Sequence, residues 1–330
     1  MNYQLYKVNI EKTITRDFEI ENIKNLEWED SLENVFISFS FTTPTVLNCG
    51  DKVELYNIPD NVVVWYGVIT TVEQTTWGEY QYSGYDVGFY LLKNELTTQY
   101  SFNKFQYILE DVCRKCELRI GEFPDFQSYG YTHIYRKETA EKILKDAYKN
   151  ILKYGVKDLY YFDCKDWRIN LKQYSSSDEL KGAISLLGQI NSFEFIKDFN
   201  IKDSIVDLKN YVEIFTDNSV NNKNTDKPDG FAKNDNSIEK YGLLRYSEDL
   251  DKDCKKKPQT VAVETLAKLN KVAHTITLSV WGNYRLQKGI ITTIEEKKLN
   301  FSKNYKVVSS KHKISAIDEE VTIEIEKYEG

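Results

Sequence analysis

Apolar and polar residues alternate in several stretches near both ends of the chain, the pattern of a β-strand with one buried face. In residues 35–41 every second side chain is apolar, and strand-like runs follow at 51–56, 62–72 and 79–85. Turn-forming residues such as Asn57, Pro59 and Asp60 separate these runs. Several short strands with turns between them predict a β-barrel or β-sandwich domain over residues 1–96.

The spacing of apolar residues changes to three and four in the middle of the chain, which indicates amphipathic helices. One helix is predicted with Ser101 as its N-cap and Gly121 just past its end. Its apolar stripe consists of Phe102, Phe105, Leu109, Val112 and Cys116. A second helix is predicted from about Glu138 to Tyr154, with a hairpin after it that turns near Lys165. Together these elements predict a helical α+β domain over residues 97–176.

The last part, residues 177–330, is predicted to be a second β domain. A linker at 174–178 precedes it, and strand-like runs resume at 193–196 and 211–215. Residues 217–236 are nearly all Asn, Asp, Lys and Ser, which predicts a mobile loop. A helix is predicted at about 258–271, because Pro258 is tolerated at a helix start and the apolar residues after it share one face. The chain then ends in alternating strands, so the expected fold class is α+β, mainly β.

Composition excludes several classes of function. The longest apolar run, residues 62–69, falls far short of the roughly 20 residues of a membrane span, so no membrane anchor is expected. The net charge is −7 and only seven of the 44 basic residues are Arg, which disfavours specific recognition of nucleic acid. Five cysteines, an odd number without framework spacing, and no secretory signal at the N-terminus suit a reducing cytoplasm.

The residues that could carry chemistry do not form a catalytic set. Cys113 and Cys116 have the spacing of a zinc or redox site, but a second ligand pair is absent from the sequence. They fall near the C-terminal end of the first predicted helix, where the dipole does not stabilise a thiolate. A peptidase pair of Cys113 with His133 fails for the same reason. The prediction is that the chain is not an enzyme and has no catalytic, metal or cofactor site.

The two ends of the chain contain a weak internal repeat. Residues 50–55 and 288–294 each have a glycine that opens a strand, and residues 65–71 and 304–310 supply a second strand to each. Two copies of one β module would produce this pattern. Sequences rich in β-strands also produce such matches by chance, so the residues alone leave both explanations open.

Several of these strings resemble the XkdQ/YqbQ family, the baseplate hub proteins of contractile phage tails and of phage-tail-like bacteriocins. The first half contributes Gly50–Tyr56, Trp65–Ile69 and Gly84–Asp86. The second half contributes Ser237–Leu244, the helix segment at 262–270, and the terminal strands at 305–312 and 321–325. The resemblance runs in pieces from about residue 35 to the end, and the order and spacing of the pieces carry it.

The resemblance implies a homotrimer in which each chain supplies two tube-type β-barrels, one at each end, to a pseudo-sixfold ring. Such a ring joins the hexameric tail tube to the central spike, and it also contacts other baseplate proteins and the tape-measure protein. The protein would assemble in the bacterial cytoplasm and remain in the phage-tail or tailocin particle. Large subunit contacts would use the aromatic residues, which make up 14% of the chain. Phage, defective prophage and bacteriocin all remain open as the source of the particle.

Two other functions are compatible with the sequence. An aromatic-rich β protein can bind carbohydrate by stacking sugars on exposed indoles, and Trp77, Trp167 and Trp281 are the candidates. A cell-wall hydrolase is disfavoured because no catalytic constellation is present, and because the chain stops at its last predicted strand.

Overall fold

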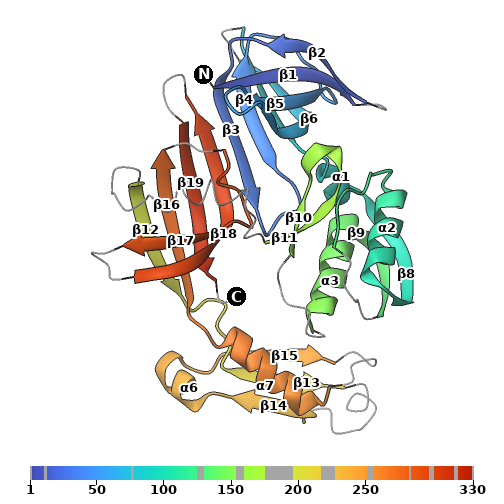
Figure 1. Ribbon diagram of the computed structural model, residues 1–330. Coiled ribbons are helices and arrows are strands. Elements are labelled where there is room, and N and C mark those ends of the chain that lie inside the picture. Colours follow the sequence, from blue (N-terminus) through green and yellow to red (C-terminus); the bar gives the residue numbers. More distant parts are fainter. Residues whose placement is uncertain are drawn as a thin grey trace. The chain divides into compact units, whose positions relative to one another are not determined.

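The structure is a computed structural model that is mainly β with a smaller helical part (Figure 1), so the expected fold class is confirmed. It describes residues 2–10, 13–75, 78–124, 130–153, 160–174, 196–216, 227–250, 256–281, 284–296, 301–315 and 319–328. The chain forms two compact units: unit 1 is Met1–Phe199 with Thr277–Gly330, and unit 2 is Asn200–Ile276. Within the described residues, no helix has the length and apolarity needed to span a lipid bilayer.

Seven antiparallel strands form the first part of unit 1. They are β1 (Tyr3–Ile10), β2 (Ile14–Ile20), β3 (Lys24–Ser31), β4 (Ser38–Thr43), β5 (Lys52–Asn57), β6 (Val62–Gln74) and β7 (Tyr80–Tyr85). The alternation in β4 buries Phe39 and Phe41 and leaves Ser38 and Ser40 partly exposed. These phenylalanines pack with Trp65, whose ring stacks on Phe39 at a centroid distance of 4.6 Å. The predicted β-strands of this region are therefore confirmed, whereas closure into a barrel stays a prediction.

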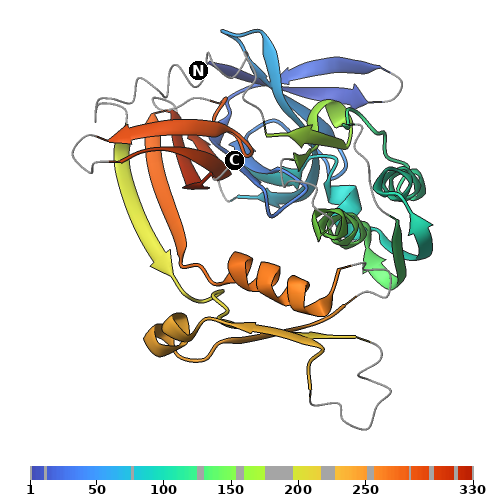
Figure 2. The ribbon, with the colours of Figure 1, turned by 60° about the horizontal axis from the view of Figure 1, so that its bottom comes forward.

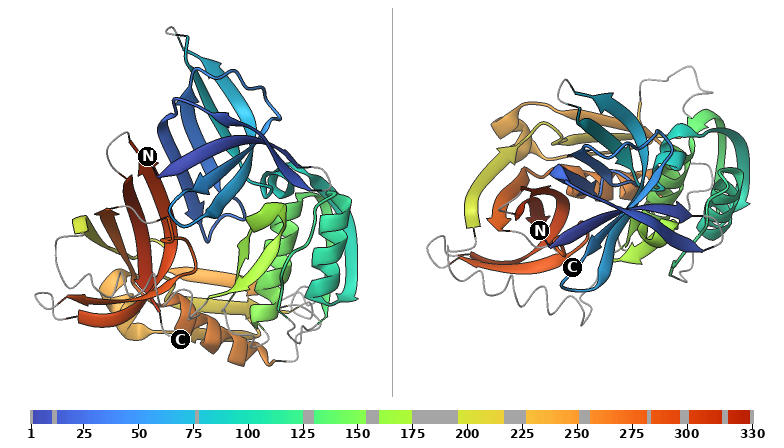
Figure 3. Two further views of the ribbon diagram at one scale, coloured as in Figure 1. Left: turned by 45° about the horizontal axis from the view of Figure 1, so that its top comes forward. Right: turned by 90° about the horizontal axis from the view of Figure 1, so that it is seen from above.

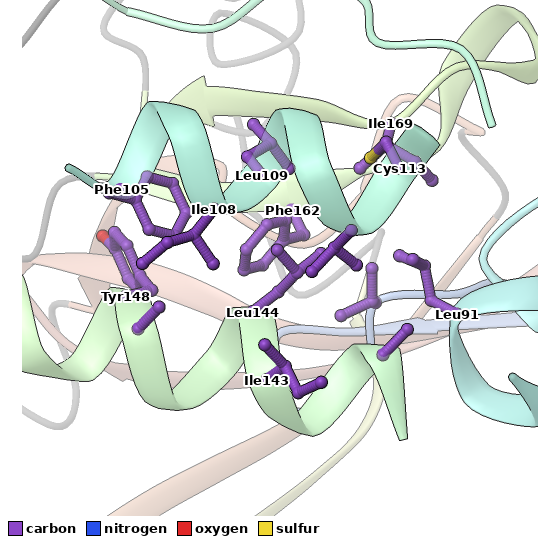
Figure 4. Packing of buried hydrophobic residues seen from close by; sticks show 14 of the residues in the cluster. Leu91, Phe105, Ile108, Leu109, Cys113, Ile143, Leu144, Tyr148, Phe162 and Ile169 are labelled. Atoms are coloured by element: carbon purple, nitrogen blue, oxygen red, sulfur yellow. The ribbon is translucent and has the colours of Figure 1, made fainter. Parts of the chain in front are cut away.

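A helical part follows in the same unit. It consists of α1 (Phe89–Lys93), β8 (Glu95–Asn103), α2 (Phe105–Lys115), β9 (Tyr131–Thr139), α3 (Ala140–Lys153), β10 (Tyr160–Asp163), the short 3-10 helix η1 (Lys165–Trp167) and β11 (Asn170–Gln173). The apolar faces of α2 and α3 pack on each other around Leu109, Leu144 and Phe162 (Figure 4). The hairpin of β10 and β11 turns at Lys165, as the sequence predicted.

The predicted start of the first helix is wrong. Ser101 and Phe102 lie in β8, and α2 begins at Phe105, after Lys104. β8 pairs with β9, about 30 residues further along the chain, and Phe102 is 71% exposed instead of lying on the helical stripe. The pairing with a distant strand overrides the local period, which a helical pattern cannot reveal.

Five strands complete the large sheet. They are β12 (Ile196–Ser204), β16 (Ala273–Trp281), β17 (Ile291–Glu296), β18 (Phe301–Ile314) and β19 (Glu319–Lys327). The order across the sheet is β12-β16-β19-β18-β3-β4-β7-β6-β5-β1-β2, and β17 also pairs with β18. The C-terminal strands therefore lie beside the N-terminal ones through β3 and β18 (Figure 3, left view).

Unit 2 is inserted between β12 and β16, and both strands continue into it (Figure 2). It contains β13 (Tyr211–Phe215), β14 (Gly230–Lys233), α6 (Asp235–Tyr241), β15 (Arg245–Asp249) and α7 (Pro258–Leu269). The three strands form the sheet β14-β13-β15, and α7 packs Ala262 against Val212 and Ile214. The helix predicted at about 258–271 is confirmed, with Pro258 in its first turn.

The predicted mobile loop at 217–236 is wrong over its second half. Residues 217–226 lie outside the described residues, but Gly230–Lys233 form β14 and α6 begins at Asp235. Ala232 is buried, and the side chain of Asn234 caps α6 by accepting a hydrogen bond from the amide of Ser237 at 2.9 Å. The polar composition that predicted a loop thus contains a helix cap.

The predicted division into domains 1–96, 97–176 and 177–330 stays a prediction. The two compact units place residues 277–330 with the N-terminal part of the chain and separate residues 200–276. Compactness alone does not show which segments fold by themselves. The predicted linker at 174–178 and strand at 193–196 fall almost entirely outside the described residues, which resume at Ile196.

Candidate assembly site

Five strands from the first half of the chain and five from the second half have the same order in the sheet. The first module, as we name it, is β3-β4-β7-β6-β5, and the second module is β12-β16-β19-β18-β17. In each module the last three strands in sequence are antiparallel neighbours, with β6 between β5 and β7, and β18 between β17 and β19.

A glycine with positive φ precedes the hairpin of each module: φ is 91° at Gly50 and 78° at Gly289. The amide of Gly50 donates to the carbonyl of Ile69 at 2.8 Å, and the Ile69 amide donates back to the residue after the glycine at 2.9 Å. The amide of Gly289 donates to Val307 at 2.9 Å, and Val307 donates back at 2.8 Å in the same way. Both hairpins thus require glycine for the same backbone conformation.

A β-bulge follows at the same place in both modules. The pairing of β6 with β7 shifts register between Ile69 and Thr71, and that of β18 with β19 shifts between Val307 and Ser309. Each shift starts at the residue that is bonded to the glycine of its module. The glycine, the paired carbonyl and the bulge coincide, so the internal repeat found in the sequence corresponds to two copies of one structural module.

The two modules meet where β3 pairs with β18. This antiparallel pairing runs from Ser309 opposite Ser31 to Ile314 opposite Leu26. At its centre the rings of Trp28 and His312 are stacked, with centroids 4.3 Å apart and planes 8° from parallel. On the other face Glu27 pairs with Lys311 at 3.2 Å. Apolar stacking on one face and ion pairing on the other set the register of the junction.

His312 is fully buried at this junction. Its Nε2 lies 3.0 Å from the carbonyl oxygen of Leu286, which assigns the ring proton to Nε2 as the donor. Within the described residues, Nδ1 has no hydrogen-bond partner. Burial lowers the pKa of His312 to about 3, so the imidazole is neutral at cellular pH and serves as an aromatic core residue.

A buried ion pair lies on the same face of β3 as Trp28. Nζ of Lys288 lies 2.7 Å from Oδ1 of Asp30, and both side chains are almost inaccessible to solvent. Nζ also donates to the carbonyl of Asn34 at 3.2 Å. Burial by itself would lower the pKa of Lys288, but the carboxylate of Asp30 raises it above its ordinary value, so the lysine is charged.

The loop between β3 and β4 is bound by all three parts of unit 1. Lys288 from the second module bonds the loop at Asn34, and Asp86, next to β7, accepts from the amide of Ile37 at 2.9 Å. From the helical part, the thiol of Cys164 donates to the carbonyl of Val35 at 2.9 Å. Burial raises the pKa of Asp86 and that of Cys164 well above their ordinary values. These groups have a structural role, which is to hold the two modules and the helical part together.

A cavity of about 980 Å³ in unit 1 lies beside Asp86, Cys164 and Lys288. Its lining includes Trp65, Asp86, Tyr161, Lys172, Tyr284 and Lys288. Two lysines of the lining are paired with carboxylates, Lys288 with Asp30 and Lys172 with Asp163, the latter at 2.6 Å. The thiol of Cys164 also lines the cavity, but its raised pKa disfavours the thiolate that a nucleophile needs.

The cysteine motif of the sequence lies in the core of the helical part. Cys113 is completely buried on α2, and burial raises its pKa to about 12 and also raises that of Cys116. His133 is exposed on β9, and its ring packs on the buried Tyr131 and Tyr135. Among the described residues, no three His, Cys, Asp or Glu side chains have the arrangement of a metal site.

The tryptophan candidates for sugar stacking are in different environments. Trp77 lies outside the described residues. Trp167 is partly buried against the core of the helical part, edge-on to Tyr90. Trp281 is 45% exposed at the end of β16, with Nζ of Lys197 5.4 Å from its ring centroid. The structure does not bring Trp167 and Trp281 into one described contact.

The residues at the junction were missed by sequence reasoning, because the strand patterns that predicted the first domain begin at residue 35. The signal for one of them is present: Asp30 continues the alternation of Leu26 and Trp28, so a carboxylate stands at a buried position of β3. A charge in an apolar alternation predicts a buried partner. Its partner, Lys288, is 258 residues away, and no local pattern identifies it.

The family model described as YQBQ-like matches residues 26–326. Solved structures with a similar fold include a tail protein of Neisseria meningitidis MC58, with a TM-score of 0.69, 14% identity and coverage of 99% of this chain and 97% of that one. A second is the 43 kDa tail protein of prophage MuSo2 from Shewanella oneidensis, with a TM-score of 0.65, 10% identity and coverage of 99% and 96%. A third is an Escherichia coli component of the type VI secretion system, with a TM-score of 0.52, 10% identity and coverage of 93% and 74%. No curated protein matches the sequence.

Proposed function

The chain belongs to the YQBQ-like family, and on this basis we propose that it is a structural hub of the baseplate in a contractile tail or phage-tail-like particle. The resemblance found from about residue 35 onward is confirmed, and the match extends it to residue 26. In the proposed assembly, three chains form a ring that joins the hexameric tail tube to the central spike.

The observation that carries this proposal is the repeated module. Two modules per chain give six modules in a trimer, and the in-chain repeat is the way a threefold protein can meet a sixfold partner. The shared glycine and bulge support the equivalence of the two modules at the level of individual backbone hydrogen bonds. The solved structures of similar fold include two tail proteins, which agrees with a role in a tail.

The proposed role is not enzymatic. The buried polar groups of unit 1 bond to one another and to the loop between β3 and β4, and the thiol at the cavity has a raised pKa. The proposed partners are two further copies of the chain, the tail tube protein, the spike protein, other baseplate proteins and the tape-measure protein. The proposed location is the bacterial cytoplasm during assembly and the tail or tailocin particle afterwards.

The mass of the particle in solution tests this proposal. Size exclusion with light scattering should give three times the 38.7 kDa of one chain as concentration rises, and electron microscopy should show a ring with a central hole. The fraction of trimer should follow mass action. A monomer at every concentration, with no ring on the grids, would overturn the hub.

A carbohydrate-binding module is the second candidate, and the exposed indole of Trp281 is the observation in its favour. If this alternative holds, the protein binds cell-wall glycans on an array and Trp281→Ala abolishes the signal, while Trp167→Ala serves as the partly buried control. A blank array for the unmodified protein removes this candidate.

A further inference from the structure

β18 is paired with other strands along both of its edges, and one of these edges pairs with two strands. β19 covers one edge. On the opposite edge β17 pairs with Phe301–Lys306, and β3 then pairs with Ser309–Ile314. On the second half of this edge, β18 of the second module therefore pairs with β3, the first strand of the first module.

β6 is the counterpart of β18, but no described strand pairs with the corresponding part of its edge. β7 pairs with one edge of β6, and β5 pairs with the other edge only as far as Val68. Beyond the bulge, Thr71–Gln74 pair with β7 alone among the described strands, and Thr71, Glu73 and Gln74 are exposed.

β12 is the counterpart of β3, and among the described strands one of its two edges is unpaired. It is the last strand of the large sheet and pairs with β16 alone among the described strands. Along it Lys197, Asn200, Ile201 and Lys202 are exposed, and Ile201 is 42% exposed. Unpaired edges of this kind bind further strands readily.

We propose that residues Thr71–Gln74 of one copy pair antiparallel with β12 of the next copy, and thereby repeat between chains the β3–β18 junction that exists within each chain. This inference rests on the proposed ring. Three in-chain junctions and three junctions between chains would then alternate and join six modules. The contact is head to tail, so each copy uses two different surfaces. All of these surfaces are occupied only when the last copy also contacts the first and a closed ring forms.

Opposite charges support the pairing. Matching β6 to β18 at the bulge that follows the glycine-bonded residue places Glu73 at the position of Lys311. For β12, the side-chain contacts of Asp203 with His274 and of Ser279 with Thr322, taken as contacts between directly opposed residues, place Lys202 at the position of Glu29. Lys311 and Glu29 lie opposite each other in the chain. The same register between copies sets Glu73 opposite Lys202, an acidic and a basic residue once more. Opposite charges favour this register, and a like pair disfavours it.

Cross-linking tests the contact directly. In a chain with Cys49→Ser and Cys254→Ser, the pair Glu73→Cys with Lys202→Cys should give covalent dimers and trimers after mild oxidation, because directly opposed Cβ atoms lie within about 5.5 Å. Each single cysteine variant should give none of the trimer. The matched control is Thr15→Cys with Lys202→Cys, since β2 is the strand at the other end of the sheet.

The outcomes separate this inference from the ring itself. A trimer that cross-links through positions 73 and 202 supports both. A trimer that cross-links only through positions 15 and 202, or through neither pair, overturns the edge pairing and leaves the hub proposal standing. A monomer at all concentrations overturns both.

A charge exchange gives a second measurement. Glu73→Lys and Lys202→Glu should each weaken the trimer at least about fivefold per junction, and the double variant should recover most of the loss. The control is Lys311→Glu. Because Lys311 lies at the junction within the chain, this substitution should leave the concentration dependence of the trimer unchanged. If the double variant weakens the trimer by the sum of the two single effects, the pairing is contradicted.

Discussion

At the scale of single residues, a few buried polar groups at the β3–β18 junction define how the two modules meet. His312 is neutral and stacked on Trp28, and Lys288 is charged and paired with Asp30. Each has a specific acceptor, at Leu286 or at Asn34. Because a buried group without its partner is costly, each of these residues should respond sharply to substitution or to pH.

Acid should destabilise the protein through His312. Its pKa is about 3 in the fold and 6.5 when unfolded, so below pH 6.5 the unfolded chain takes up a proton that the folded chain excludes. The contribution is complete above pH 6.5 and falls by about 1.4 kcal/mol per pH unit toward pH 3. Urea unfolding of the protein and of His312→Gln, whose amide can still donate to Leu286, checks this. Between pH 3 and 6.5, the slope of the unfolding free energy against pH should be smaller for the variant by the contribution of about one proton. Equal slopes for the two proteins would contradict a buried, neutral His312.

Removal of Lys288 should cost more than its exposure suggests. Lys288→Met leaves the carboxylate of Asp30 buried without its partner, and we expect a loss of about 3–5 kcal/mol in the free energy of unfolding. The double variant Lys288→Met with Asp30→Asn should recover a large part of this loss. Lys311→Met, on the exposed face of the junction, is the control and should cost at most about 1 kcal/mol. A double variant as unstable as the single one would show that the pair does not act as a unit.

At the scale of elements, the repeated hairpins show how one backbone requirement appears twice in different sequences. Gly50 and Gly289 make equivalent hydrogen bonds, yet their surroundings differ. A Cβ at Gly50 would have no neighbour within 4 Å, whereas a Cβ at Gly289 would lie 2.4 Å from the ring of Tyr161. The first module therefore ends against open space at this point, and the second packs against the helical part.

The two glycines form a matched pair for substitution. Gly50→Ala should cost about 1–2 kcal/mol from the positive φ alone. Gly289→Ala should cost about 2–5 kcal/mol, because overpacking against Tyr161 is added to the strain. Thermal and urea unfolding measure both. In a Tyr161→Ala background the two costs should become equal; a difference that survives there would refute the steric explanation.

At the scale of the whole molecule, the strands of the two modules belong mainly to unit 1, while unit 2 has its own sheet, helices and small core. Unit 2 enters between β12 and β16, the counterparts of β3 and β4, which a short loop connects in the first module. An insertion at this loop changes neither the order of the strands nor the glycine and bulge of the hairpin. The architecture thus separates the repeated sheet from the inserted unit.

Local stability should follow the two units. Ile214→Ala removes a fully buried side chain of unit 2 and should lower stability there by about 2–5 kcal/mol. Hydrogen exchange with mass spectrometry should show faster exchange in β13, β15 and α7, and unchanged exchange in β5, β6 and β7. Leu55→Ala, in the core of the first module, should give the opposite pattern. Faster exchange across both units in either variant would mean that they unfold together.

The aromatic residues show how far composition carried the interpretation. Many of them lie in the cores: Tyr82, Phe41 and Trp65 are buried in the first module, and Tyr100 and Phe105 are buried in the helical part. The residues of subunit contacts stay a prediction. The composition could not indicate that Trp28 stacks on a histidine from β18, because that contact joins segments almost 300 residues apart.

The sequence by itself determined the local elements: the alternation in β4, the stripes of α2 and α3, the proline that begins α7, and the glycines that open both hairpins. These follow from the side-chain period and from backbone sterics, which act over a few residues. Only the tertiary structure decided that β8 extends through Ser101, where a helix cap was expected, that part of the polar segment after residue 226 forms β14, and that β3 pairs with β18. Contacts between distant segments determine which strands pair and which buried charges meet. The alternation of side chains along a strand has a period of two with any partner, so it does not identify the partner.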